Sequence, residues 1–172
     1  MRLGLLITLY SLSVCYLAGQ KETEKLADAI NSPSAIVQEL LDLITAEPGE
    51  ARDFVAMRNL FSPDVRFTAL YRGGDFGVPY ESIGLDDFIE MMQDEYYTNG
   101  FTEVELHQEV DEFNVIAQVF QTYYGEDSEG EREWGISSYQ LVFYEGRWWI
   151  YSILWTGADR LEDIPEAYRG SH

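Results

Sequence analysis

Apolar residues recur at helical spacing in the first half of the chain. Ser32-Pro33 is typical of a helix start, because the Ser side chain caps free backbone N–H groups and Pro fits the first helical position. A second apolar segment covers about residues 54–61 and ends in a turn at Ser62-Pro63, and a third covers about 84–96. The stripes of the first and third segments are Ile36, Val37, Leu40, Leu41 and Ile44, and Leu85, Phe88, Ile89 and Met92. The pattern predicts three amphipathic helices.

Beyond residue 100 the pattern changes to alternation, which is the period of half-buried strands. Residues 102–111 and 115–124 alternate around Phe113-Asn114, a candidate two-residue turn. Residues 135–155 form the most apolar long run outside the N-terminus, with the turn signal Glu145-Gly146 in the middle. Residues 65–71 predict an earlier strand. The element order predicts an α+β fold in which three N-terminal helices pack on a strongly curved antiparallel sheet.

A turn at Glu145-Gly146 fixes which residues of 135–155 share a face of the sheet. The predicted inner face holds Ser137, Tyr139, Leu141, Phe143, Trp148, Ile150 and Ser152. The predicted outer face holds Trp149, Tyr151, Ile153 and Trp155. The three helices can cover only one face, so this outer aromatic patch predicts a homodimer interface. The alternative is that the segment from Thr156 folds back over it.

The same reasoning places the polar residues of 102–111 on a solvated face. With a turn at Phe113-Asn114, the residues turned to solvent are Glu103, Glu105, His107 and Glu109. His107 is therefore predicted to be a surface histidine, and the glutamates to be a charged surface that opposes aggregation.

The N-terminus has the layout of a secretory signal peptide. Arg2 precedes an apolar stretch over residues 3–18, and charged residues resume only at Lys21. The predicted organisation is a signal peptide over 1–20, a tether over 21–32, one domain over 33–157 and an irregular tail over 158–172. This predicts a periplasmic or secreted protein with no stable membrane anchor after signal removal. The alternatives are a retained anchor and a lipoprotein modified at Cys15.

The net charge of the chain limits the classes of molecule that it can bind. The formal net charge is −20, and only two lysines occur, Lys21 and Lys25. This balance disfavours binding to nucleic acid phosphates or anionic lipids and is typical of an acidic, solvated surface. Cys15 is the only cysteine, which excludes thiolate zinc sites and cysteine nucleophiles from a processed chain. The spacing of side chains predicts no metal site and no cofactor motif.

Five segments in order resemble uncharacterised bacterial members of the NTF2-like, SnoaL-like superfamily. They are MRNLFSPD at 57–64, GF at 100–101, FNVIAQVF at 113–120, GISSYQL at 135–141 and RWWIYSILW at 147–155. The chain departs from that group at Trp134, where Arg is usual, and at Asn114, where Gly is usual. The resemblance implies a cone-shaped α+β fold with a pocket at its wide end. It does not imply one reaction, because this scaffold carries several unrelated activities.

The predicted inner face supplies hydrogen-bonding groups within apolar walls, as in a small-molecule pocket. The predicted pocket residues are Tyr71, Gln108, Gln121, Tyr123, Ser137, Tyr139, Trp148 and Ser152. The function that this favours is non-enzymatic binding of a small, mostly apolar ligand. The alternative is an isomerase, dehydratase or cyclase, in which Tyr123 or Tyr139 polarises a carbonyl and Asp75 acts as the base. A third hypothesis is an interaction protein whose outer aromatic face binds another subunit.

Overall fold

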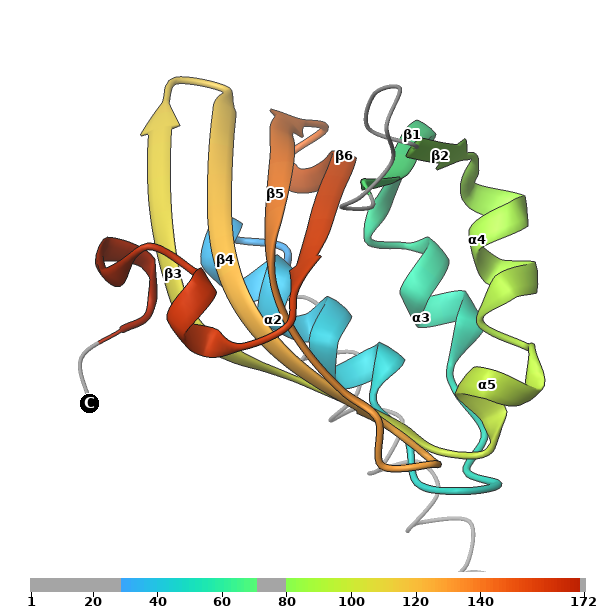
Figure 1. Cartoon of the computed structure of the whole chain (residues 1–172). Helices are drawn as coiled ribbons and strands as arrows, with labels where there is room; N and C mark the ends of the chain where they lie inside the picture. The colour runs from blue at the N-terminus through green and yellow to red at the C-terminus, as the bar shows by residue number, and fades with distance from the viewer. Residues whose placement is uncertain (1–28, 71–79, 171–172) are drawn as a thin grey trace, which may run out of the picture.

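The computed structural model describes residues 29–70 and 80–170. The predicted signal peptide, most of the predicted tether, Tyr71 and Asp75 lie outside the described residues. The described chain forms a curved sheet with α-helices on its concave side and the C-terminal segment on its convex side (Figure 1). Within these residues, no helix is both long and apolar enough to span a membrane.

The sheet has six strands in the order β2-β1-β6-β5-β4-β3. Their bounds are β1 Phe61–Leu70, β2 Tyr80–Ile83, β3 Phe101–Phe113, β4 Ile116–Asp127, β5 Arg132–Tyr144 and β6 Arg147–Ala158. Strand β2 pairs with the predicted early strand β1 and was not expected from the sequence. The expectation of a purely antiparallel sheet is wrong at one seam, because β1 runs parallel to β6. The helices between β1 and β3 take the chain to the other edge of the sheet. The later strands then return across it, so that β6 lies beside β1 and runs in the same direction.

The helices follow the predicted stripes but not the predicted number. They are α2 Pro33–Ile44, α3 Phe54–Arg58, α4 Leu85–Met91 and α5 Glu95–Thr98. The predicted start of α2 is confirmed, since the Ser32 hydroxyl accepts a hydrogen bond from Ala35 N at 3.1 Å. The predicted third helix divides in two because Asp94 caps a new helix by accepting from Tyr96 N.

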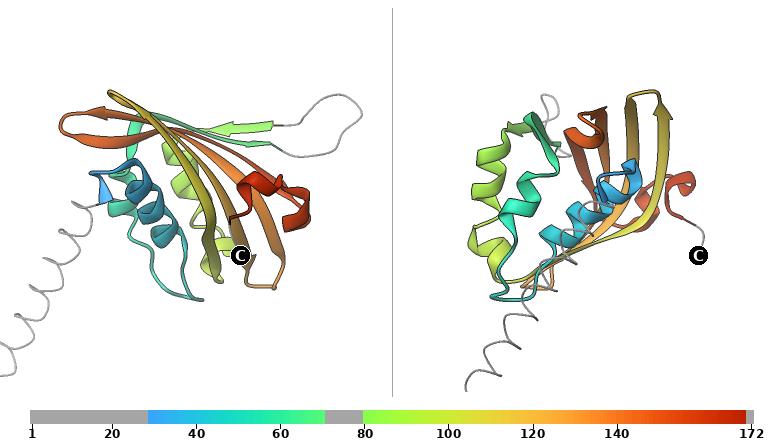
Figure 2. Two further views of the ribbon diagram at one scale, coloured as in Figure 1. Left: turned by 90° about the vertical axis from the view of Figure 1, so that its left-hand side faces the viewer. Right: turned by 180° about the vertical axis from the view of Figure 1, so that it is seen from behind.

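The core lies between the helices and the concave face of the sheet (Figure 2). Helix α2 packs across β3, β4 and β6, and α4 packs on β1. Phe61 and Phe67 of β1 meet edge to face with ring centroids 5.0 Å apart, and Phe67 stacks on Phe88 of α4 at 4.1 Å. These aromatic contacts fix the distance between α4 and the sheet.

The hairpin turn at Glu145-Gly146 is confirmed, but the faces predicted from it change halfway along β6. Tyr144 pairs with Arg147, and both turn residues have positive φ. The pairing then shifts between Gln140 and Leu141, which leaves Tyr151 as an extra residue in β6. Because an extra residue reverses the alternation, Ile153 is buried and Ser152 pairs with exposed Gln140 on the convex face. The predicted positions of Ser152, Ile153 and Trp155 are therefore wrong.

A second bulge reverses the alternation in β3. The turn lies one residue later than predicted, at Asn114-Val115, since Phe113 pairs with Ile116. Leu106 is the extra residue between the pairs Glu105 with Tyr123 and His107 with Thr122. Glu103 and Glu105 therefore turn to the concave side, which contradicts their predicted place in solvent. His107 stays on the predicted face of the sheet, but it is half-buried and not the exposed surface histidine that was predicted.

The C-terminal segment packs on the convex side of β3 and β4. It contains two short 3₁₀ helices, η1 Leu161–Asp163 and η2 Glu166–Tyr168. The Thr122 hydroxyl donates to the carbonyl of Tyr168, and the Phe120 and Tyr168 rings lie 5.0 Å apart. The tail therefore covers part of the convex face, on the strands away from Trp149 and Tyr151.

Candidate functional site

A cavity of about 370 Å³ lies between the concave face of the sheet and helices α2, α4 and α5. Most of its wall is apolar and aromatic. Its lining residues are Leu40, Ile44, Phe67, Phe88, Met91, Met92, Tyr96, Tyr97, Phe101, Glu103, Tyr123, Gly125, Glu131, Arg132, Glu133, Ser137, Tyr139, Ile153 and Trp155. The volume lies within the range of about 300–1,000 Å³ that is typical of small-molecule sites.

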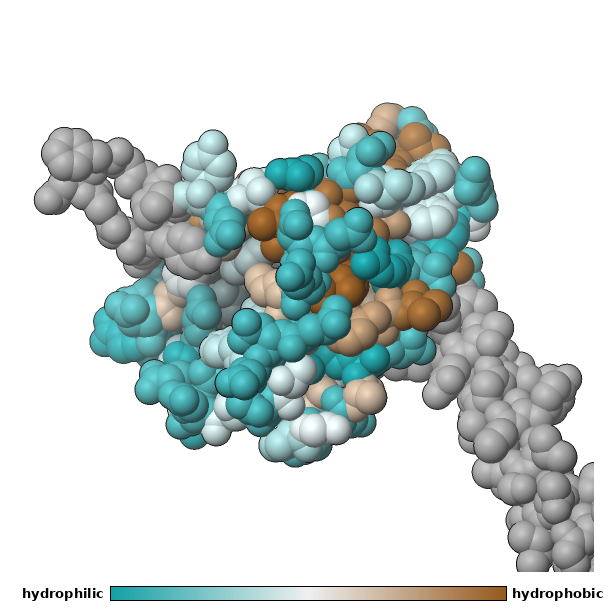
Figure 3. Space-filling model, turned by 90° about the vertical axis from the view of Figure 1, so that its right-hand side faces the viewer, coloured by the Kyte–Doolittle hydropathy of each residue, from teal (hydrophilic) through white to brown (hydrophobic). Residues whose placement is uncertain are grey.

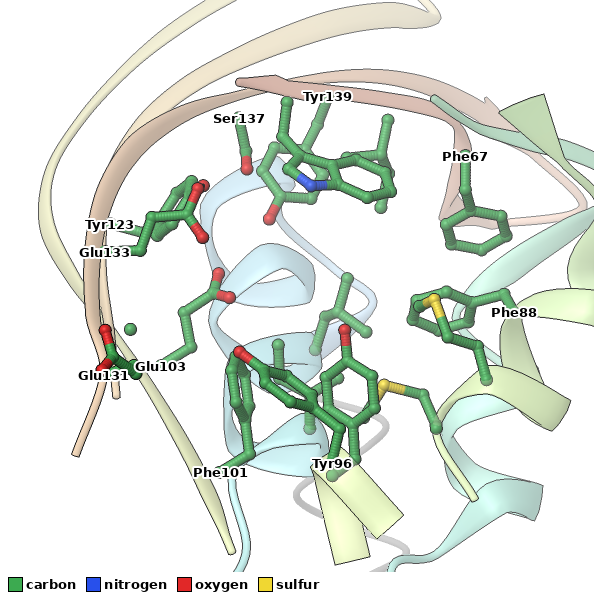
Figure 4. A pocket seen from close by; sticks show the side chains of 18 of the residues that line it. Phe67, Phe88, Tyr96, Phe101, Glu103, Tyr123, Glu131, Glu133, Ser137 and Tyr139 are labelled. Carbon is green, nitrogen blue, oxygen red and sulfur yellow. The ribbon is translucent and has the colours of Figure 1, made fainter. Parts of the chain in front are cut away.

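The polar groups of the cavity gather on one side. The side chains of Glu103, Tyr123 and Glu133 point inward from β3, β4 and β5, and Phe67 and Phe88 lie opposite them (Figure 4). Tyr96 and Phe101 close the side between these two groups. A ligand in this space would contact carboxylates at one end and aromatic rings around the rest of its surface.

Two paired glycines make room for Tyr123 and Glu133. Gly135 of β5 and Gly157 of β6 are cross-strand partners. A Cβ atom at Gly135 would lie 2.3 Å from the Tyr123 hydroxyl, and one at Gly157 would lie 2.0 Å from Glu133 Oε1. Because neither glycine carries a side chain, Tyr123 and Glu133 lie over the strands, where the Tyr123 hydroxyl donates to Glu133 Oε1 at 3.1 Å.

Glu103 has the most perturbed carboxyl group of the cavity. Burial against the cavity wall raises its pKa to about 8, and the negative charge of Glu133 contributes to this rise. The Glu103 side chain points into the cavity, and the residue as a whole is half-buried (Figure 4). A carboxyl group with this pKa is largely protonated at pH 7 and can donate a hydrogen bond or exchange a proton near neutral pH.

The tyrosines of the cavity stay protonated. Burial raises the pKa of Tyr123 and of Tyr139 above the usual range, and Glu133 and Glu103 respectively add to the effect. Burial also raises the pKa of Tyr96, to which the charges of Asp127, Glu133 and Glu103 contribute. These hydroxyl groups are therefore hydrogen-bond donors, and none of them can serve as a base at neutral pH.

A hydrogen-bonded chain behind the wall holds Tyr139 in place. The Tyr139 hydroxyl donates to Gln121 Oε1 at 3.1 Å, and Gln121 Nε2 donates to Glu105 at 2.8 Å. Gln108 Nε2 donates to the other oxygen of Glu105 at 2.7 Å. Gln121 is fully buried, so its amide fixes the orientation of the Tyr139 ring that forms the wall.

The structure brings only some of the predicted pocket residues to the cavity. Tyr123, Ser137 and Tyr139 line it. Gln108, Gln121 and Trp148 lie on the concave face but are not among the lining residues. Ser152 lies on the other face, for the reason given above.

The predicted outer patch is also divided. Ile153 and Trp155 line the cavity, whereas Trp149 and Tyr151 remain on the convex side. Trp149 is covered within its own chain, because the Tyr144 ring stacks on it at 5.1 Å and the Arg147 guanidinium lies 4.0 Å above it. Tyr151 and Leu154 are exposed on the same strand.

The sequence reasoning missed Glu103, Glu133 and most of the aromatic wall. The signal that could have found the two glutamates is the glycine content of the neighbouring strands. Gly125 pairs with both Glu103 and Glu133, so a position without a side chain separates two facing carboxylates. Glycine inside a strand often marks close approach by another group.

No described basic residue neutralises the cavity carboxylates. Arg132 lies at the rim and forms an ion pair with Glu126 at 3.2 Å. Among the described residues, neither Glu103 nor Glu133 has an ion pair with a basic side chain. The same part of the chain contains no group of three His, Cys, Asp or Glu side chains that could hold a metal ion.

Comparison with known proteins gives structural relatives only. No family model and no curated protein matches the sequence. An NTF2-like protein with a cystatin-like fold from Novosphingobium aromaticivorans has a TM-score of 0.57 at 12% identity, over 89% of this chain and 92% of that chain. A cystatin-like-fold protein of unknown function from Nostoc punctiforme has a TM-score of 0.53 at 12% identity, over 75% and 95%.

The association domain of CaMKII from C. elegans is a third similar structure, with a TM-score of 0.50 at 18% identity, over 70% of this chain and 88% of that chain. Identities this low establish the fold and leave function to the site. The sheet order, the helices on its concave face and these structural relatives together show that the chain has the NTF2-like fold.

Proposed function

We propose that this protein is an exported, non-enzymatic binder of a small molecule, which it holds in the cavity between the sheet and the helices. The observation that carries the proposal is the cavity itself, with about 370 Å³ of space and a wall of aromatic and aliphatic side chains. A few polar groups, including Ser137 and the carboxyl groups of Glu103 and Glu133, point into it and would orient a ligand (Figure 4). Export is supported by the signal-like sequence of residues 1–20.

Hydrophilic residues cover much of the side of the molecule that Figure 3 shows. On the side shown in Figure 3, hydrophobic residues reach the surface in patches that hydrophilic residues border. Such surfaces keep a protein soluble while an internal cavity carries the apolar binding.

Filling the cavity should weaken the binding of an apolar reporter dye. Ser137→Leu adds an apolar side chain at a buried position of the wall, so the dye affinity should fall by about tenfold or more. Ser138→Leu is the matched control, because the next residue along β5 points to the opposite face. Fluorescence titration measures both, and equal dye binding by the two variants would contradict the proposed site.

We also propose a homodimer through the convex face of β6. Tyr151 and Leu154 are exposed there, in an area that the C-terminal tail leaves uncovered. The similar C. elegans structure is an association domain, which agrees with self-association on this fold.

Native mass spectrometry of protein purified from its source would test export, dimerisation and ligand binding together. The expected result is a subunit that lacks about the first 20 residues, as the signal-peptide pattern predicts. The complex should have twice the subunit mass, and an additional small mass should be lost on denaturation. A monomer at micromolar concentration would exclude the dimer, and an intact N-terminus would exclude processing.

A further inference from the structure

The cavity presents negative charge and hydrogen-bond acceptors without a basic partner. Glu103 and Glu133 extend into it from strands on either side of Gly125, and Glu131 lies at its rim. The basic residue at this rim, Arg132, is paired with Glu126. An anionic ligand would therefore meet repulsion from Glu133 at this end of the cavity.

The remaining wall is a set of aromatic rings. Phe67, Phe88, Tyr96, Phe101, Tyr123 and Trp155 all line the same cavity as these carboxylates. The face of an aromatic ring attracts a cation through its quadrupole, by about 0.5–2 kcal/mol per contact, and more strongly where water is excluded. The carboxylates and the ring faces therefore both favour a positively charged ligand.

We propose that the ligand of this cavity is an organic cation, an amine or quaternary ammonium group with an apolar body. Its charged end lies between Glu103 and Glu133, and its apolar body lies against Phe67 and Phe88. The inference rests on the proposed small-molecule function and assigns the ligand class for the same site.

The protonation of Glu103 couples this binding to pH. A bound cation favours the carboxylate form, so binding releases a proton from a group whose pKa is about 8 in the free protein. The other titratable groups that line the cavity with Glu103 are Glu133, Tyr123, Tyr96, Tyr97 and Tyr139, with Glu131 and Arg132 at the rim. A permanent cation should therefore bind more tightly as the pH rises from 6 to 9.

Two probes of the same shape test the charge directly. Phenyltrimethylammonium is a permanent cation, and tert-butylbenzene is its neutral isostere. Binding of each to the full processed protein is followed by NMR titration at pH 6 and pH 9. At pH 9 the cation should bind about tenfold more tightly than the isostere, the factor expected from one or two close cation contacts in a water-poor site.

Matched variants assign the effect to the cavity. Glu103→Gln should weaken cation binding about tenfold at pH 9, remove its pH dependence and leave isostere binding unchanged. Glu112→Gln makes the same charge change at an exposed position of the same strand and should change nothing. Glu133→Gln, at an exposed residue of the cavity mouth, gives a second test that does not depend on the folding of the Glu103 variant.

The outcomes separate the two proposals. Equal or tighter binding of the neutral isostere would overturn the cation assignment and leave the small-molecule function standing. Cation binding that neither glutamate variant reduces would also overturn it. Failure of both probes to bind would contradict the small-molecule function itself.

Discussion

Glu103→Gln is expected to stabilise the protein at pH 8 by about 2–4 kcal/mol and to have little effect at pH 5. The cavity raises the pKa of Glu103 from 4.5 to about 8, mainly through burial. A tenfold change in proton affinity between the unfolded and folded chain corresponds to about 1.4 kcal/mol, and solvent that reaches the accessible part of the side chain reduces the total by screening. Glutamine has nearly the same shape as the protonated acid and cannot ionise.

The direction of this pH dependence follows from the number of protons that the folded and unfolded chains bind. Between pH 4.5 and about 8 the folded protein keeps a proton on Glu103 that the unfolded chain has released. The free energy of unfolding therefore falls as the pH rises through this interval and levels off above it. The glutamine variant lacks this slope.

Urea denaturation at pH 5, 6, 7 and 8 measures the effect, with Glu112→Gln as the control at an exposed position of the same strand. The control should follow the original protein at every pH. If the free energy of unfolding of Glu103→Gln changes with pH in the same way as that of the original protein, the carboxyl group is not buried as the cavity requires.

Gly135→Ala is expected to destabilise the protein by about 3 kcal/mol, the upper part of the range for overpacking a tight site. The added methyl group would lie 2.4 Å from the Tyr123 ring and 2.6 Å from the carbonyl oxygen of Thr156. The second contact is with backbone, so β5 and β6 would have to separate locally. The buried Tyr123 ring would also have to leave its place over β5.

Gly157→Ala is the matched control, because it makes the same change at the cross-strand partner. The three atoms nearest to its methyl group all belong to the Glu133 side chain, which is exposed and can move aside. The expected cost is about 1 kcal/mol, from the loss of the Tyr123 to Glu133 hydrogen bond. Equal thermal denaturation midpoints for the two variants would contradict this view of the glycine pair.

Local signals in the sequence were sufficient wherever a short-range contact decides the structure. Ser32-Pro33 specifies the start of α2 because the capping group and the capped N–H are three residues apart. Glu145-Gly146 specifies the β5–β6 turn because a two-residue turn depends on its own backbone angles. The α+β class and the concave layer of helices follow from the same periodicities.

The two strand bulges were beyond the reach of those signals. No local signal in the sequence marks Tyr151 or Leu106 as an extra residue, and the bulge becomes visible only when the neighbouring strand is in place. Each bulge exchanges the faces of all residues beyond it. Ile153 and Trp155 thereby line the cavity, and so does Glu103, for which the alternation predicts a solvent-exposed position.

Neighbouring residues and composition are sufficient to predict the start of α2, the β5–β6 turn, most of the helices and strands and the acidic character of this protein. The tertiary structure decided which side of the sheet each residue beyond a bulge occupies, since that depends on pairing between strands. It also brought Glu103 and Glu133, 30 positions apart in the chain, to either side of Gly125 in one aromatic cavity. The candidate site is therefore a product of strand register, which no single segment of the sequence contains.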